Sequence, residues 1–117
     1  MFKFLKRFFK KDIHVYNMPI MYVLVRNDLA PIYRCVQGAH ALAQYALEYP
    51  ENLGKWKNEY LIFLGVRNHK DIILWYEKLK AAHKSISCFQ EPDLDGHITA
   101  VACFDTGEIF KGLRLTS

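Results

Sequence analysis

The sequence predicts a single α/β domain in which a mixed sheet of four strands carries helices on its faces. The chain has 117 residues, the length of one domain. Short runs of apolar, β-forming residues alternate along it with longer segments whose apolar residues recur at helical spacing. This alternation is typical of a sheet covered by helices.

Four segments have the pattern of strands. Ile20 to Val25 and Tyr60 to Val66 are continuous apolar runs, which indicates strands buried on both faces. Ser85 to Phe89 and His97 to Phe104 follow later, with the hairpin-type turn Asp95-Gly96 between them. Helices separate the first three strands, so the order along the chain predicts a mixed sheet.

Two longer helices and one short helical turn are predicted, and the loop over 50–58 could include a further short helix. The first helix covers 31–49, because Pro31 suits a first turn, where its missing N–H is not needed. The second covers 69–83 and follows Asn68, whose side chain can cap a helix start. A short helical turn is expected within 106–117.

The first helix has two distinct stripes. One is apolar and predicts the side that faces the core; it contains Ile32, Val36, Ala39, Ala43 and Ala46, with Cys35 and Leu42 beside them. The other is polar, with steps of four, three and four residues; it contains Tyr33, Gln37, His40 and Gln44. A polar stripe of this kind could line a cleft.

The chain divides into a basic arm, residues 1–18, and a domain, residues 19–117. The arm has an apolar side (Phe2, Leu5, Phe8, Phe9) and a basic side (Lys3, Arg7, Lys10). It could lie on an anionic membrane surface, contact RNA, or pack on the domain. Its cations interrupt the apolar stretch that a secretory signal needs, and no other run approaches the ~18 apolar residues of a membrane span. A cytoplasmic protein is expected.

Composition adds weaker constraints. The net charge is +4 and the pI near 9.0, which is compatible with a polyanionic partner such as RNA. At 51% hydrophobic residues the chain is typical of a folded globular protein. Cys35, Cys88 and Cys103 are odd in number and show no Cys-x-x-Cys spacing, so buried, reduced thiols are expected.

The order of several short motifs resembles one family. Arg26-Asn27-Asp28-Leu29 after the first strand, then Gln37-Gly38-Ala39-His40-Ala41 on the following helix, is similar to the signature of the archaeal and eukaryotic class (class two) of peptidyl-tRNA hydrolases. Ser85 to Gln90 resembles the third strand of that family, and Thr99 to Ala102 resembles the fourth, which opens with Thr. The likeness covers roughly residues 20–105.

The sequence departs from the family pattern near the expected site. The lysine that the family has four residues before its glutamine falls on Tyr33, with Arg34 adjacent. The aspartate after the third strand falls on Glu91, and segment 91–96 is shorter and lacks the usual Gly-Arg-Thr.

The resemblance implies hydrolysis of the ester between a peptide and the terminal ribose of tRNA, without a metal or another cofactor. It implies catalytic roles for His40, Glu91, Thr99 and Asp28. It implies substrate binding by Arg26, Arg34, Tyr33, Gln37 and Asp93. On the residues alone, His40 could equally be structural, and Glu91 and Asp93 could serve the turn that follows them. Asp93, Asp95 and Gly96 faintly resemble a calcium loop, but the remaining ligand positions are absent.

A second function remains open on the same fold. The chain could be a catalytically degenerate module that binds RNA or protein through the former cleft. Loss of the family lysine favours this alternative. Retention of His40, Asp28 and Thr99 favours the hydrolase.

Overall fold

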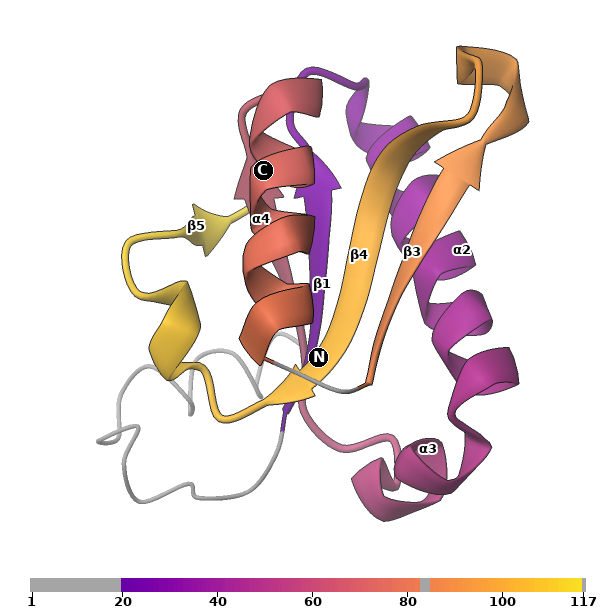
Figure 1. Ribbon diagram of the computed structural model, residues 1–117, viewed down its shortest axis with the longest axis vertical. Coiled ribbons are helices and arrows are strands. Elements are labelled where there is room, and N and C mark those ends of the chain that lie inside the picture. Colours follow the sequence, from indigo (N-terminus) through magenta and orange to yellow (C-terminus); the bar gives the residue numbers. More distant parts are fainter. Residues whose placement is uncertain (1–19, 83–84, 117) are drawn as a thin grey trace.

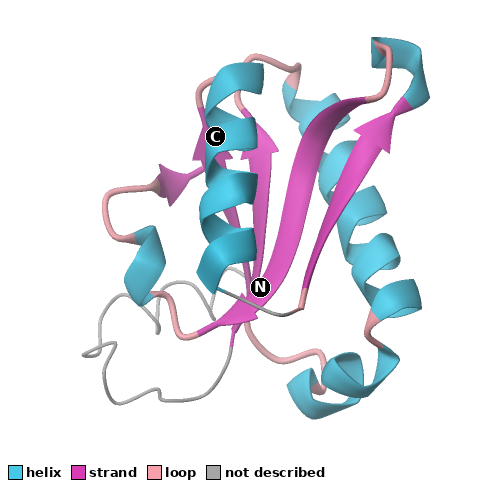
Figure 2. Cartoon of the chain, viewed as in Figure 1, coloured by secondary structure: helices cyan, strands magenta, loops and turns pink. Residues whose placement is uncertain are grey.

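The computed structural model describes residues 20–82 and 85–116, so the predicted arm lies outside the described residues. The described chain is an α/β unit of three layers, with one sheet between helices (Figures 1 and 2). The first long helix covers one face of the sheet and the last covers the opposite face. The predicted α/β class is therefore confirmed.

The sheet is mixed, with strand order β3-β4-β1-β2-β5. The central strand β1 (Ile20–Arg26) pairs in parallel with β2 (Leu61–Val66) and antiparallel with β4 (His97–Asp105). β3 (Ile86–Glu91) pairs antiparallel with the other side of β4, and β5 (Arg114–Leu115) with the other side of β2.

The prediction of four strands is wrong, since the described residues form five. The additional strand β5 has only two residues, too few to show any periodicity in the sequence. It exists because the tail turns back along β2 after the expected helical turn, a 3-10 turn at Glu108–Phe110. That turn confirms the helical part of the prediction.

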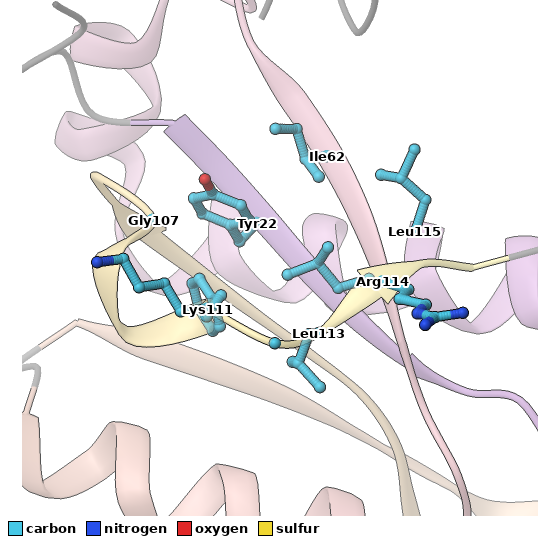
Figure 3. A pocket seen from close by; sticks show the side chains of 10 residues that line it. Tyr22, Ile62, Gly107, Lys111, Leu113, Arg114 and Leu115 are labelled. Carbon is cyan, nitrogen blue, oxygen red and sulfur yellow. The ribbon is translucent and has the colours of Figure 1, made fainter. Parts of the chain in front are cut away.

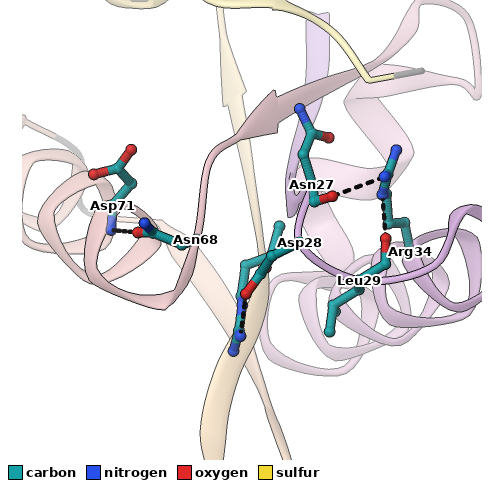
Figure 4. Close-up of polar contacts among 7 residues, drawn as sticks. Asn27, Asp28, Leu29, Arg34, Asn68 and Asp71 are labelled. Carbon is teal, nitrogen blue, oxygen red and sulfur yellow. Dashed lines mark hydrogen bonds and ion pairs between the residues drawn. The ribbon is translucent and has the colours of Figure 1, made fainter.

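The helices begin where local signals predicted. Helix α2 (Pro31–Glu48) has its proline in the first turn, and the short α3 (Pro50–Trp56) follows directly. Helix α4 (His69–Ala82) is capped by Asn68, whose Oδ1 accepts the backbone N–H of Asp71 at 3.1 Å (Figure 4). None of the described helices is long and apolar enough to cross a membrane.

Helix α2 turns a different side to the sheet from the one predicted. Ile32 and Val36, which were expected in the core, are 79% and 46% exposed. The helix approaches the sheet closely at Gly38, where an added Cβ would lie 2.3 Å from the ring of Phe63. The side that faces the sheet is therefore not the predicted apolar stripe but one that combines small residues with a glutamine and a tyrosine. The buried residues of α2 are Gln37, Gly38, Ala41 and Tyr45.

The three cysteines are free thiols in different environments. Cys103 is buried in the core on the α4 side of the sheet, where burial raises the pKa of its thiol. Cys88 is half-buried. Cys35 is exposed on the outer side of α2, so the expectation of a buried thiol is wrong there. It shares the misassigned stripe of α2.

Candidate functional site

A chain of hydrogen bonds joins α2 to the end of β3 and the start of β4. The Thr99 hydroxyl donates to Oε1 of Gln37, and Nε2 of Gln37 donates to Oε1 of Glu91 at 3.0 Å. The Tyr33 hydroxyl donates to the same Glu91 oxygen at 2.9 Å. Gln37 and Thr99 are fully buried, whereas Tyr33 and Glu91 are half-buried. The network therefore runs from the core to a carboxylate at the surface.

An irregularity in the sheet brings Thr99 into this network. Phe89 pairs with Ala100 and Gln90 pairs with Ile98, so Thr99 is an extra residue on β4. A bulge of this kind turns a side chain away from the regular alternation. Here the hydroxyl of Thr99 meets α2, where it fixes the orientation of the Gln37 amide.

Glu91 is held in its ionised form. Hydrogen bonds from Tyr33 and Gln37, then the backbone N–H of Asp93 and the charge of nearby His40, lower the pKa of the Glu91 carboxyl. The hydrogen bond that Tyr33 donates to Glu91 also raises the pKa of the Tyr33 phenol. At neutral pH the site therefore presents a carboxylate whose Oε1 accepts two side-chain donors.

His40 lies one turn along α2 from Gln37 and remains exposed. Its ring stacks on Phe89 of β3, with centroids 4.2 Å apart and planes inclined by 8°. The stack fixes the plane of the imidazole beside Glu91. An imidazole next to a carboxylate can accept and return a proton near neutral pH.

Arg26 and Asp28 form a separate group. Nε and Nη2 of Arg26 donate to the two carboxylate oxygens of Asp28 at 3.0 and 2.8 Å, and this pairing lowers the pKa of Asp28. Arg26 follows Tyr22 and Leu24 at the strand period of two, and both belong to the core on the α4 side. The pair therefore lies on the opposite face of the sheet from the α2 network.

Two histidines adjoin this ion pair. His69, at the start of α4, stacks on His97, at the start of β4, with centroids 4.0 Å apart. Burial, followed by the charges of His97 and Arg26, lowers the pKa of His69. Nη1 of Arg26 is buried and has no hydrogen-bond partner among the described residues. Within the group, Arg26 and Asp28 carry opposite charges, and His97 pairs with Glu91 across β3 and β4.

Arg34 stabilises the loop between β1 and α2. Its guanidinium donates to the carbonyl oxygens of Leu29 at 2.6 Å and Asn27 at 2.7 Å (Figure 4). These bonds hold the loop against the first turn of the helix.

The structure brings together six of the nine predicted site residues. The network and its neighbours comprise Tyr33, Gln37, His40, Glu91, Asp93 and Thr99. Arg26, Asp28 and Arg34 lie elsewhere. Sequence reasoning missed Phe89, because it occupies a strand and has the pattern of a core residue. It also missed the His69–His97 stack, which no spacing in the sequence indicates.

A separate cavity of about 600 Å³ lies on the α4 side of the sheet (Figure 3). Tyr22 and Ile62 form its floor, and the C-terminal segment forms its outer wall. Burial raises the pKa of the Tyr22 phenol, so this group stays protonated at neutral pH. Among the described residues, no carboxylate or imidazole lines the cavity, which makes it a poor place for acid–base chemistry.

The described residues contain no group of three or more histidine, cysteine or acidic side chains that could bind a metal ion. The chemistry available at the network is therefore that of a carboxylate, an imidazole and a phenol. Neither protein-family models nor curated proteins match this chain.

Proposed function

We propose that this protein hydrolyses the ester bond of peptidyl-tRNA and releases peptide and tRNA. The observation that supports this most is the Glu91 carboxylate, fixed by Tyr33 and Gln37 beside the exposed His40. Ester hydrolysis needs a group that orients or deprotonates water, and these two side chains can share that task. The choice of peptidyl-tRNA as the substrate rests on the sequence motifs that resemble those of class-two peptidyl-tRNA hydrolases.

In the proposed reaction His40 takes a proton from a water molecule as the water oxygen attacks the ester carbonyl carbon. Glu91 stabilises the imidazolium that forms, because opposite charges attract across a short distance. The imidazolium then returns the proton to the ribose oxygen as the ester bond breaks. Thr99 is fully buried, so it acts as a positioning residue through Gln37 and does not touch the substrate.

The phosphates of tRNA also need cations. Arg26 is paired with Asp28, and Arg34 is bonded to the β1–α2 loop. We therefore assign phosphate contacts to the basic arm, in which five of the first eleven residues are Lys or Arg. The proposed substrate arises during translation, so we expect the protein in the cytoplasm.

The test is hydrolysis of a purified N-acetyl-aminoacyl-tRNA by the full chain. His40→Ala and Glu91→Gln should each lower kcat by at least about tenfold, since a positioned acid or base typically contributes 10²–10⁴-fold. Glu51→Gln, on the exposed side of α3, is the matched carboxylate control and should leave kcat unchanged. Wild-type turnover in both site variants would remove His40 and Glu91 from the reaction.

One observation favours a binding module instead. Tyr33 occupies the position of the family lysine and donates to Glu91 through a hydroxyl group, so the network gains no positive charge there. A wild-type chain that binds tRNA but hydrolyses no acyl-tRNA would establish this second candidate.

A further inference from the structure

β3 is an edge strand whose sequence does not protect it. Within the described residues its one neighbour is β4. In most proteins such edge strands are short or carry charges and prolines. The strand at the opposite edge, β5, is short, with only two residues. The first five residues of β3, Ile-Ser-Cys-Phe-Gln, contain neither a charge nor a proline. An edge of this kind is suited to pairing with another strand.

A groove of about 540 Å³ runs along this edge. Three elements line it: α2 with Gln44, Glu48 and Tyr49, α4 with Tyr76, and β3 with Ile86, Cys88, Phe89 and Gln90. Most of these side chains carry polar groups, so the groove offers hydrogen-bond partners beside the strand. Burial, followed by a hydrogen bond with Cys88, raises the pKa of Tyr76 to about 12, so its hydroxyl stays protonated.

The pairing of β1 determines which way its backbone groups point. The backbone N–H of Met21 donates to the carbonyl of Tyr60, so Met21 faces β2. Alternate residues of a strand face opposite neighbours. Tyr22 and Leu24 therefore direct their N–H and C=O groups to β4, where they form hydrogen-bonded pairs.

The same alternation passes through β4 to β3. The partners of Tyr22 and Leu24 on β4 are Cys103 and Val101, whose backbone groups thus face β1. On the other side, Cys103 and Val101 lie opposite Ile86 and Cys88. These two residues of β3 therefore turn their N–H and C=O groups away from β4 and toward the groove. The side-chain hydroxyl of Tyr49 reaches the outward carbonyl of Ile86 at 3.5 Å.

The groove leads to the proposed active site. Helix α2 runs antiparallel to β3, with Glu48 bonded to Ser87 at one end and His40 stacked on Phe89 further along. Gln37 then reaches Glu91 at the end of the strand. A ligand lying along β3 would therefore have one end at the Glu91 carboxylate.

We propose that the groove binds the peptide part of the substrate as an extra strand, parallel to β3. The direction rests on the proposed function, because the esterified carboxyl end must lie at Glu91. Backbone hydrogen bonds would hold the peptide regardless of its sequence, as in other cases of strand addition. Six residues of β3, at roughly 3.3 Å each, provide room for about five peptide residues.

The first test uses synthetic peptides and needs no tRNA. N-acetyl pentapeptide amides of two unrelated sequences are titrated into the full chain and followed by amide NMR. Both should bind within about threefold of each other and shift the amides of Ile86, Cys88 and Gln90. Two N-methylated peptides are then compared, one methylated at the odd-numbered and one at the even-numbered nitrogens. One of them should bind about tenfold more weakly and the other should lose much less affinity, since only alternate N–H groups of the peptide face β3. Equal affinity of the two N-methylated peptides, or no change in the amide signals of β3, would overturn the proposal.

The second test compares substrates of different length. Cys88→Pro removes an outward N–H, and proline is tolerated on an edge strand at such a position. It should lower the kcat/KM of acetyl-pentapeptidyl-tRNA relative to acetyl-aminoacyl-tRNA by about fivefold to tenfold, whereas the control Cys35→Ala, at the exposed cysteine of α2, should not. An unchanged ratio of the two kcat/KM values in Cys88→Pro would overturn the proposal that the groove binds the peptide.

Two further outcomes separate the alternatives. Peptide binding without hydrolysis of either substrate would support the groove and refute the hydrolase. Sedimentation that shows a dimer of the wild-type chain and a monomer of Cys88→Pro would mean that β3 pairs with a second copy, and would overturn the peptide assignment.

Discussion

At the residue scale, hydrogen bonds through Gln37 link the buried Thr99 hydroxyl to the Glu91 carboxylate at the surface. Thr99→Val keeps the shape but removes the donor to Gln37, which leaves a buried amide oxygen unsatisfied. The free energy of unfolding should fall by about 1–3 kcal/mol. Because the Gln37 amide would then turn more freely, the pKa of Glu91 should rise toward its usual value. Urea unfolding and a carboxyl NMR titration measure the two effects.

Thr99→Ser is the matched control for that change. Serine keeps the hydroxyl and loses only a methyl group, so the pKa of Glu91 should remain low. Equal Glu91 titration curves in the valine and serine variants would show that the Thr99 hydrogen bond does not reach the carboxylate.

The pH dependence of stability belongs to the same scale. The pKa of Glu91 is lower in the folded protein than its usual value, so its contribution to stability is present above the unfolded pKa and is lost as pH falls through the folded pKa. Tyr33→Phe removes the largest cause of the shift. The difference in unfolding free energy between pH 7 and pH 3 should therefore shrink in this variant. A difference as large as that of the wild type would contradict the assignment.

At the element scale, the most apolar stripe of α2 is not its buried side. Ile32 lies on its apolar but exposed stripe, whereas Tyr45 is fully buried. Ile32→Lys should change the free energy of unfolding by less than about 0.5 kcal/mol, as for most surface positions. Tyr45→Ala should lower it by about 3–5 kcal/mol, as for a large core aromatic. Chemical denaturation of both variants tests which face of the helix is inside.

This face is where sequence reasoning failed, and the cause is physical. Periodicity identifies apolar residues, but the sheet accepts α2 through close contact at Gly38 and through the buried amide of Gln37. Helix starts were predictable because Pro31 and Asn68 act on adjacent backbone groups. The orientation of a helix depends on surfaces far away in the chain, which local patterns do not encode.

The candidate site shows the same division. The polar stripe of α2 was evident from spacing, and two of its residues, Tyr33 and Gln37, bond Glu91. The bulge that turns Thr99 toward them depends on the register between β3 and β4, which no residue of the sequence signals. Arg26 and Asp28 were expected in the same site as His40, but their ion pair lies on the other face of the sheet.

At the scale of the whole molecule, the C-terminal segment closes the sheet and stabilises a distant loop. The Thr116 hydroxyl donates to Oδ1 of Asn27 at 2.7 Å, and its backbone N–H donates to the carbonyl of Phe63 at 3.2 Å. Deleting residues 112–117 removes these bonds and the β5 pairing. The free energy of unfolding should fall by roughly 2–4 kcal/mol, at about 1 kcal/mol for each lost hydrogen bond.

Thermal unfolding of the truncated chain measures this loss. Thr116→Val is the milder comparison, since it removes the side-chain bond to Asn27 and keeps the strand. A truncated chain as stable as the full one would show that β5 is dispensable for folding.

Because of the close contact at Gly38, this glycine sets the distance between α2 and the sheet at the proposed active site. Alanine normally favours a helix over glycine by about 1 kcal/mol, and Gly54→Ala in α3, where nothing lies within 4 Å, should be stabilising. Gly38→Ala should instead destabilise the fold, because its methyl group meets Phe63. It would also lift α2 and separate Gln37 from Thr99. A single methyl group on Gly38, a residue with no reactive side chain, should therefore break the hydrogen-bonded link between Thr99 and the proposed catalytic residues.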